Sequence, residues 1–150
     1  MDIYKEYIKM CKRAEEIQEN WIVNCCDLVS SKYNNYVYQI LEIEGCFFDS
    51  KAYKVRIRRD DGVVGGDNTN NLIWLPRQDQ LQDMVKQTHP NPNKFTEILQ
   101  DLFGFTEFIW DEDGIVNKDL AFEPQSFEQL LLAYVMETNY NKIWNKEEWR

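Results

Sequence analysis

The chain has 150 residues, 43% of them hydrophobic and 14% aromatic, with 17 Lys/Arg against 26 Asp/Glu and a formal net charge of −9. This length can bury a hydrophobic core without a metal or disulfide staple. No apolar run reaches the roughly 20 residues that cross a bilayer, and the acidic balance excludes a protein that holds bare nucleic acid through Lys and Arg.

The first predicted element is a helix over residues 3–21. Spacings of four and three place six residues on one helix face: Ile3, Tyr7, Met10, Ala14, Ile17 and Trp21. We expect this face to pack on the chain's own core, and a seam for a partner helix is the alternative. The segment lacks the apolar core and cleavage site of a secretory signal, so we expect a cytoplasmic protein.

Three strands are predicted next, over residues 21–30, 36–45 and 52–62, and the last two form a hairpin. The expected cross-strand pairs are Ile43 with Val55, Leu41 with Ile57, Glu44 with Lys54, and Glu42 with Arg56. This register makes one face apolar and the other ion-paired.

Basic residues alternate along the third strand at Lys54, Arg56 and Arg58. Facing glutamates favour a salt-bridged, solvated surface over an anion-binding stripe. Arg58 and Arg59 remain without an expected partner. Residues 60–71 are rich in Gly, Asn and Asp and are predicted to be a long mobile loop that matches neither a calcium loop nor a phosphate loop.

A short strand over residues 72–75 and a helix that starts at Pro76 come next. The buried helix face is predicted to hold Leu81, Met84 and Val85. Arg77 does not suit the positive end of a helix dipole. We expect it to pair with an acidic group elsewhere, such as one from residues 97–119, or to face a ligand or partner.

Another helix is predicted over residues 93–105, capped by Asn93, with an apolar face of Phe95, Ile98, Leu99, Leu102 and Phe103. Residues 105–125 are predicted to form a hairpin or irregular strand around an acidic turn at 111–114. Ser126 and Gln129 predict a capping box that starts the last, centrally placed helix. Trp144 and Trp149 lie in the tail that follows.

Catalytic and metal motifs are missing from the sequence. His89 is the only histidine, and Cys11, Cys25, Cys26 and Cys46 show no paired C-x-x-C spacing. We expect buried thiols, with Cys25 and Cys26 on opposite faces of a strand. The sequence predicts no enzyme, no cofactor and no metal site.

The negative charge is concentrated in one segment. Residues 90–138 hold 2 Lys/Arg and 10 Asp/Glu, whereas residues 1–89 hold 12 and 14. We expect this segment to attract a basic protein. The residues predicted to bind the partner are Asp101, Glu107, Asp111, Glu112, Asp113, Asp119 and Glu123.

The order of elements predicts an α+β fold, in which a small antiparallel sheet packs against about four helices in a single domain of residues 1–150. No internal repeat or interdomain linker is visible.

Three stretches resemble a family of small proteins encoded by phages and prophages of low-GC Gram-positive bacteria: "YKEYIKMCKRAEEIQENW", "WLPRQDQLQDMV" and "LLLAYVMETNYNKIWNKEEW". The resemblance covers about a third of the chain and implies a phage accessory protein in a bacterial cytoplasm. It supplies no catalytic or ligand-binding residues.

Two hypotheses of function follow. The first is a non-enzymatic protein whose acidic segment blocks a basic host protein, such as a nucleic-acid-binding defence component, in the manner of an anti-CRISPR protein. The alternative is a small-molecule or nucleotide-binding module in which Arg58, Arg59 and Arg77 gather around an anion. A weaker third hypothesis is an assembly protein whose tryptophan tail joins an oligomer.

Overall fold

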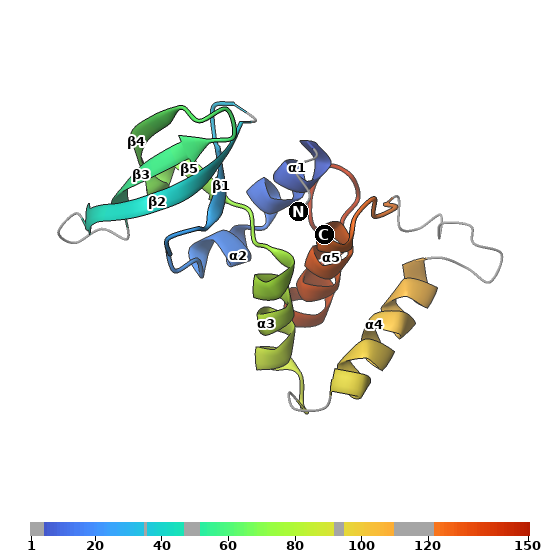
Figure 1. The fold of residues 1–150 in the computed structure, drawn as a ribbon. Coiled ribbons are helices and arrows are strands. Elements are labelled where there is room, and N and C mark those ends of the chain that lie inside the picture. Colours follow the sequence, from blue (N-terminus) through green and yellow to red (C-terminus); the bar gives the residue numbers. More distant parts are fainter. Residues whose placement is uncertain (1–4, 35, 47–51, 92–94, 110–121) are drawn as a thin grey trace. The chain divides into compact units, whose positions relative to one another are not determined.

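The computed structural model describes residues 5–34, 36–46, 52–91, 95–109 and 122–150 (Figure 1). The fold is α+β with an antiparallel sheet, as predicted. The chain divides into two compact units, which we name the sheet unit (Ile3–Pro76) and the helical unit (Met1–Asp2 with Arg77–Arg150). That the two units form one domain stays a prediction.

The sheet unit contains two helices, five strands and a 3-10 helix among its described residues. They are α1 (Lys5–Arg13), α2 (Glu15–Glu19), β1 (Leu28–Ser31), β2 (Val37–Cys46), β3 (Tyr53–Arg59), β4 (Val64–Asn68), η1 (Thr69–Asn71) and β5 (Leu72–Trp74). The described helices of the helical unit are α3 (Gln78–Thr88), α4 (Phe95–Ile109) and α5 (Phe127–Tyr140). None of these helices is long and apolar enough to span a membrane.

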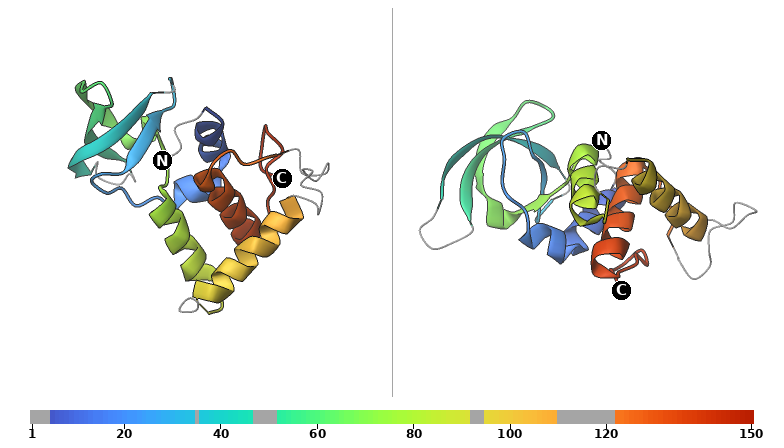
Figure 2. Two further views of the ribbon diagram at one scale, coloured as in Figure 1. Left: turned by 45° about the vertical axis from the view of Figure 1, so that its right-hand side comes forward. Right: turned by 90° about the horizontal axis from the view of Figure 1, so that it is seen from below.

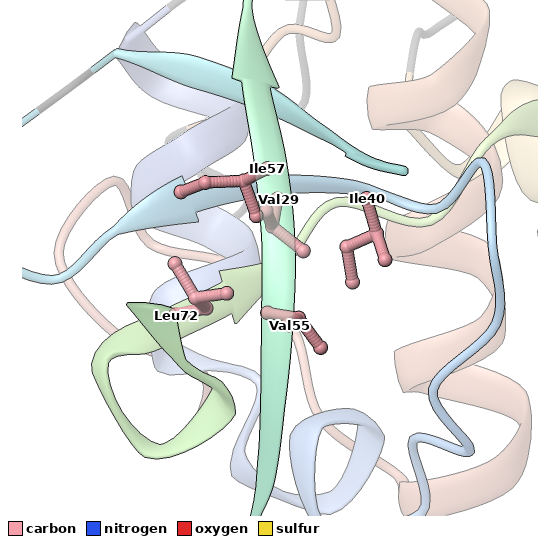
Figure 3. Packing of buried hydrophobic residues seen from close by; sticks show 5 residues of the cluster. All are labelled: Val29, Ile40, Val55, Ile57 and Leu72. Carbon is pink, nitrogen blue, oxygen red and sulfur yellow. The ribbon is translucent and has the colours of Figure 1, made fainter. Parts of the chain in front are cut away.

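The sheet has the strand order β4-β3-β2-β1-β5, and every neighbouring pair is antiparallel. It is strongly curved (Figure 2). Its core comes from strands far apart in the sequence, with side chains that lie together in Figure 3: Val29, Ile40, Val55, Ile57 and Leu72. Burying one such side chain contributes about 1.5–3 kcal/mol.

The register of β2 and β3 is partly as predicted. Ile43 lies opposite Val55 and Glu42 opposite Arg56, but Ile40 rather than Leu41 lies opposite Ile57. The register shifts between Ile40 and Glu42 and again between Ile43 and Gly45, so each bulge adds one residue to β2. Alternation alone cannot reveal such insertions.

The second bulge leaves the predicted ion pair intact. Lys54 lies opposite Gly45 in the ladder, yet its Nζ is 3.2 Å from Oε2 of Glu44. One of the two predicted ion pairs of this face, Glu44 with Lys54, is therefore present, through a long side chain that bridges the shifted register. Glu42 and Arg56 are opposite each other in the ladder.

The prediction of a mobile loop over residues 60–71 is wrong. A tight turn with Gly62 at φ 88° leads into β4, whose residues pair along β3 from Lys54 to Arg58. β4 lies at the edge of the sheet and is held by backbone hydrogen bonds to β3, which glycine can form as well as any residue. The Gly- and Asn-rich sequence of this segment therefore suggested a loop where the structure has a strand.

The prediction of a strand over residues 21–30 is also wrong for most of its length, because β1 begins only at Leu28. Asp27 is 1% exposed, and its Oδ2 accepts hydrogen bonds of 2.9 Å from Trp21 Nε1 and from the Asn24 backbone N–H. These bonds close a turn in which Cys26 has φ 71°. Cys25 and Cys26 are consequently exposed thiols rather than strand residues.

The predicted N-terminal helix is interrupted at Ala14, which separates α1 from α2. Four of the six residues predicted for its apolar face are nevertheless buried, namely Tyr7, Met10, Ala14 and Ile17. Trp21 is partly buried, and Ile3 lies outside the described residues. Gln18 secures the break: its Nε2 donates to the carbonyl oxygens of Cys11 (3.1 Å) and Trp74 (3.0 Å), and its Oε1 accepts from Trp74 N–H at 2.8 Å. These bonds fasten α2 to β5.

In the helical unit α5 is the central helix, as predicted, with six consecutive buried residues from Leu131 to Met136. Ser126 Oγ accepts from Gln129 N–H at 3.2 Å, which confirms the cap. The Gln129 side chain accepts from the Gln125 N–H at 3.0 Å. α3 packs along α5 (Figure 1).

Helix α4 continues to Ile109, so residues 105–109 are helical and not part of a hairpin. The predicted apolar face is buried at Ile98 and Leu102, whereas Phe103 is 64% exposed. The predicted Asn93 cap and the predicted turn at 111–114 lie outside the described residues.

The C-terminal tail folds back on itself in a small hairpin. Trp144 and Trp149 pair as an antiparallel bridge, and their ring centroids are 5.0 Å apart. They are 1% and 8% exposed, so the chain itself covers the two tryptophans that the assembly hypothesis needs at an interface.

Candidate functional site

Almost all the net charge belongs to the helical unit. This unit holds 7 Lys/Arg against 15 Asp/Glu, a formal charge of −8, whereas the sheet unit holds 10 against 11, a charge of −1. The excess of carboxylates over basic side chains is therefore concentrated in the helical unit.

The structure places three of the predicted acidic residues on the surface of the helical unit. Asp101 and Glu107 are exposed on α4, and Glu123 is exposed shortly before α5. Asp111, Glu112, Asp113 and Asp119 lie outside the described residues.

An apolar groove of about 190 Å³ lies between α3, α4 and α5. Its lining includes Ile98, Leu99 and Leu102 from α4 and Phe127 and Leu131 from α5. Gln78, Gln82, Val85 and Lys86 line it from α3. Phe127 is 42% exposed, so part of the groove's aromatic surface faces solvent.

Negative charge reaches the lining of the groove at Tyr134, a buried residue of α5. Burial raises the pKa of the Tyr134 hydroxyl, and the negative charges of Asp101 and Glu137 raise it further. A hydrogen bond with Thr138 acts in the opposite direction and lowers the pKa. The charged side chain in the groove lining is Lys86, which pairs with Asp83.

His89 and Asp101 join the end of α3 to α4. His89 Nε2 lies 2.9 Å from Asp101 Oδ2, and Asn91 N–H donates to Nδ1 at 3.0 Å. Since Nδ1 accepts, Nε2 carries the proton and donates to the carboxylate. Both ring nitrogens of His89 therefore take part in hydrogen bonds that connect the end of α3 to α4.

The arginines of the alternative hypothesis have contacts of their own. Arg58 Nη2 donates to Gln39 Oε1 at 2.9 Å. Arg59 forms a double hydrogen bond with Asp61 and lies 4.6 Å from the centre of the Tyr36 ring. Adjacent strand residues point to opposite faces, so Arg58 and Arg59 do not converge on one ligand.

Arg77 is the N-cap of α3 rather than a residue of its first turn. Its Nε and Nη2 lie 3.1 and 3.2 Å from the two carboxylate oxygens of Asp79, and its N–H donates to Gln80 Oε1 at 2.9 Å. The expectation of an acidic partner from residues 97–119 missed this pair. In both Arg59 and Arg77 the Nε–Nη2 edge of the guanidinium is bound to a carboxylate.

Within the described ranges, no three His, Cys, Asp or Glu side chains lie close enough together to hold a metal ion. Cys11 is buried, as expected for a thiol in a core. The buried-thiol prediction is wrong for Cys25 and Cys26 because they occupy a turn.

The groove was not predicted as a site from the sequence. Ile98, Leu99 and Leu102 were assigned to an apolar helix face, which is normally covered by the core. The signal that identifies the groove is Phe127, an aromatic residue in the polar first turn of α5, directly after its cap.

Comparisons with protein-family models, curated proteins and solved structures found no match.

Proposed function

We propose that this chain is a non-enzymatic phage accessory protein that binds and blocks a basic host protein through the acidic surface of its helical unit. The observation that carries the proposal is the charge of −8 in this unit against −1 in the sheet unit. The target class that such a surface favours is a nucleic-acid-binding defence component, because carboxylates can occupy the positions of phosphates.

The groove supports this function with an apolar anchor. Charge complementarity directs encounter and selects the partner, whereas well-packed apolar contacts supply most of the affinity. Phe127 and the aliphatic side chains of α4 offer such contacts, and Asp101 is an exposed carboxylate of the same helix α4. The occupant that fits is an amphipathic segment of the host protein with Lys or Arg on its polar side.

The host context comes from the family resemblance, which implies a bacterial cytoplasm. A host protein recovered on the immobilised chain at low salt is expected to be a nucleic-acid-binding protein. It should be released as the ionic strength rises, since a surface charge interaction is screened beyond about 10 Å at 0.1 M salt.

The test is a pull-down from Gram-positive host lysate at low and high salt with the full chain. A matched variant reverses the charges of Asp111, Glu112 and Asp113. The proposal fails if no nucleic-acid-binding protein is recovered at low salt, or if the variant recovers it as well as the wild type does.

A further inference from the structure

The sheet unit contains a second cavity, a cleft of about 320 Å³ between α2 and the β5 side of the sheet. This volume falls within the roughly 300–1,000 Å³ of small-ligand sites. Its lining mixes apolar, polar and charged side chains: Glu15, Gln18, Glu19, Trp21, Val23, Lys32, Thr69, Asn70, Leu72 and Ile73.

Trp21 gives the cleft a rigid aromatic surface. Its ring stacks on the buried Trp74 ring, with centroids 6.0 Å apart and planes inclined by 7°. Its Nε1 donates to Asp27 Oδ2 at 2.9 Å, which fixes the ring in its plane. Trp74 covers one side of Trp21, the ring also packs against the hydrophobic core of the sheet, and its remaining surface contributes to the lining of the cleft.

The charged groups of the cleft have opposite signs. Glu15 and Glu19 are four residues apart on α2 and so lie on the same helix face. Lys32 follows β1, and its backbone N–H is held by the Asn71 carbonyl oxygen at 2.9 Å. In the part of the chain that the structure describes, none of these three side chains forms an ion pair.

We propose that this cleft binds the guanidinium group of an arginine, with Trp21 as its stacking surface and Glu15 and Glu19 as its carboxylate partners. A guanidinium is planar, stacks on aromatic rings and forms paired hydrogen bonds with carboxylates. A single guanidinium can therefore contact both the Trp21 ring and the two glutamates. An ammonium group stacks less well and lacks the fork geometry.

Lys32 indicates which group the other end of the ligand carries. Its ammonium group donates to an oxygen acceptor, which in an arginine is the backbone carbonyl or the free carboxylate. The shared chemistry is therefore a guanidinium at one end and an oxygen acceptor at the other, supplied by free arginine or by an arginine within a peptide. This inference uses only the sheet unit and does not depend on the proposed function.

The experiment is calorimetric titration of the full chain with four probes: L-arginine, the peptide acetyl-Ala-Arg-Ala-amide, its Lys counterpart, and agmatine, which lacks the oxygen acceptor. Both arginine probes should bind, and the Lys peptide and agmatine should bind more weakly. Tighter binding of the peptide identifies a polypeptide ligand, and tighter binding of L-arginine identifies the free amino acid. No host protein is present, so the result is separate from that of the pull-down.

Two matched double variants carry the test. Glu15→Gln with Glu19→Gln should weaken binding of the arginine probes roughly tenfold or more, because two charged hydrogen-bond acceptors are lost. Glu42→Gln with Asp60→Asn removes the same charge from exposed residues outside the cleft and should leave binding unchanged. Lys32→Met should abolish the difference between L-arginine and agmatine.

The proposal is overturned if neither arginine probe binds, if the Lys peptide binds as tightly as the Arg peptide, or if the two double variants behave alike. All four carboxylates of these variants are exposed, so folding is preserved. The Trp21 indole N–H signal in NMR spectra should shift on addition of the arginine probes, and its constancy would also contradict the assignment.

Discussion

His89 and Asp101 connect α3 to α4 through a hydrogen bond of 2.9 Å between Nε2 and Oδ2, while the other imidazole nitrogen accepts from Asn91 N–H. The imidazole is 8% exposed and the carboxylate 58%, so water reaches the hydrogen bond from the Asp101 side but not from the His89 side. It fixes the corner of the helical unit beside the apolar groove. The chain's only histidine is thus part of the frame of the proposed site.

Breaking this connection should destabilise the helical unit. His89→Ala and Asp101→Ala are each expected to lower the free energy of unfolding by about 1 kcal/mol. The double variant should lose less than the sum, because the second substitution has no bond left to break. Urea unfolding of the four proteins measures this coupling. Fully additive losses would show that the two side chains do not interact.

The Arg77–Asp79 pair predicts a pH dependence. The hydrogen bond from Arg77 lowers the pKa of the Asp79 carboxyl below its ordinary value. Because the folded pKa is below the unfolded one, the stabilisation is complete above the unfolded pKa and is lost as the pH falls through the folded pKa.

Replacing Arg77 by Gln should raise the pKa of Asp79 toward its ordinary value. NMR titration of the Asp79 carboxyl in wild type and Arg77→Gln measures the change. Asp83, which pairs with Lys86 on the same helix, serves as the internal control. An Asp79 titration that is identical in both proteins would rule out the pair in solution.

The N-cap of α5 gives a third prediction. Ser126→Ala removes the oxygen that accepts from Gln129 N–H and should cost about 1 kcal/mol of stability. Ser126→Asp should retain most of it, because a carboxylate can cap the same N–H. Thr96→Ala, an exposed substitution on α4, is the control and should change stability by less than 0.5 kcal/mol, roughly the range of neutral surface substitutions.

The tail hairpin gives a fourth prediction. Trp144→Ala removes a side chain that is 1% exposed and should cost about 3–5 kcal/mol, whereas Trp144→Phe should cost less. Thermal unfolding compares these two variants with Glu147→Gln, an exposed substitution in the same hairpin. If Trp144→Ala is as stable as Glu147→Gln, the tail does not pack as described.

Much of the fold could be predicted from periodicity, because helix faces and strand alternation follow directly from backbone geometry. The stripe from Tyr7 to Ile17, the pairing of Ile43 with Val55 and the Ser126 cap are examples. These features depend on neighbours within a few residues or on a repeated pattern.

The errors share a different cause. The break at Ala14 is secured by Gln18, which binds Trp74 from 56 residues away, and the turn before β1 is closed by the buried carboxylate of Asp27. β4 is a glycine-rich strand held by its neighbour's backbone. In each case contacts made in the folded state override the local preference of the sequence.

The candidate sites show the same division. The acidic character of the helical unit follows from counting charges along the chain. The groove and the Trp21 cleft require residues from several elements to converge, and no local pattern records that convergence. The pairing of Arg77 with Asp79 was missed because Arg77 was expected in the first turn of the helix, where residues two apart do not face each other. In the structure Arg77 is the N-cap and has an extended backbone, which allows the pair.

The most direct test of the account is the affinity of the captured host protein for two matched triple variants. One neutralises the described acidic surface of the helical unit with Asp101→Asn, Glu107→Gln and Glu123→Gln, and the first change leaves an oxygen for His89. The other makes the same charge change in the sheet unit with Glu42→Gln, Glu44→Gln and Asp60→Asn. The account predicts that the first variant binds at least tenfold more weakly at low salt, roughly 1.4 kcal/mol, and that the second binds like the wild type. Equal affinity of the two variants would contradict it.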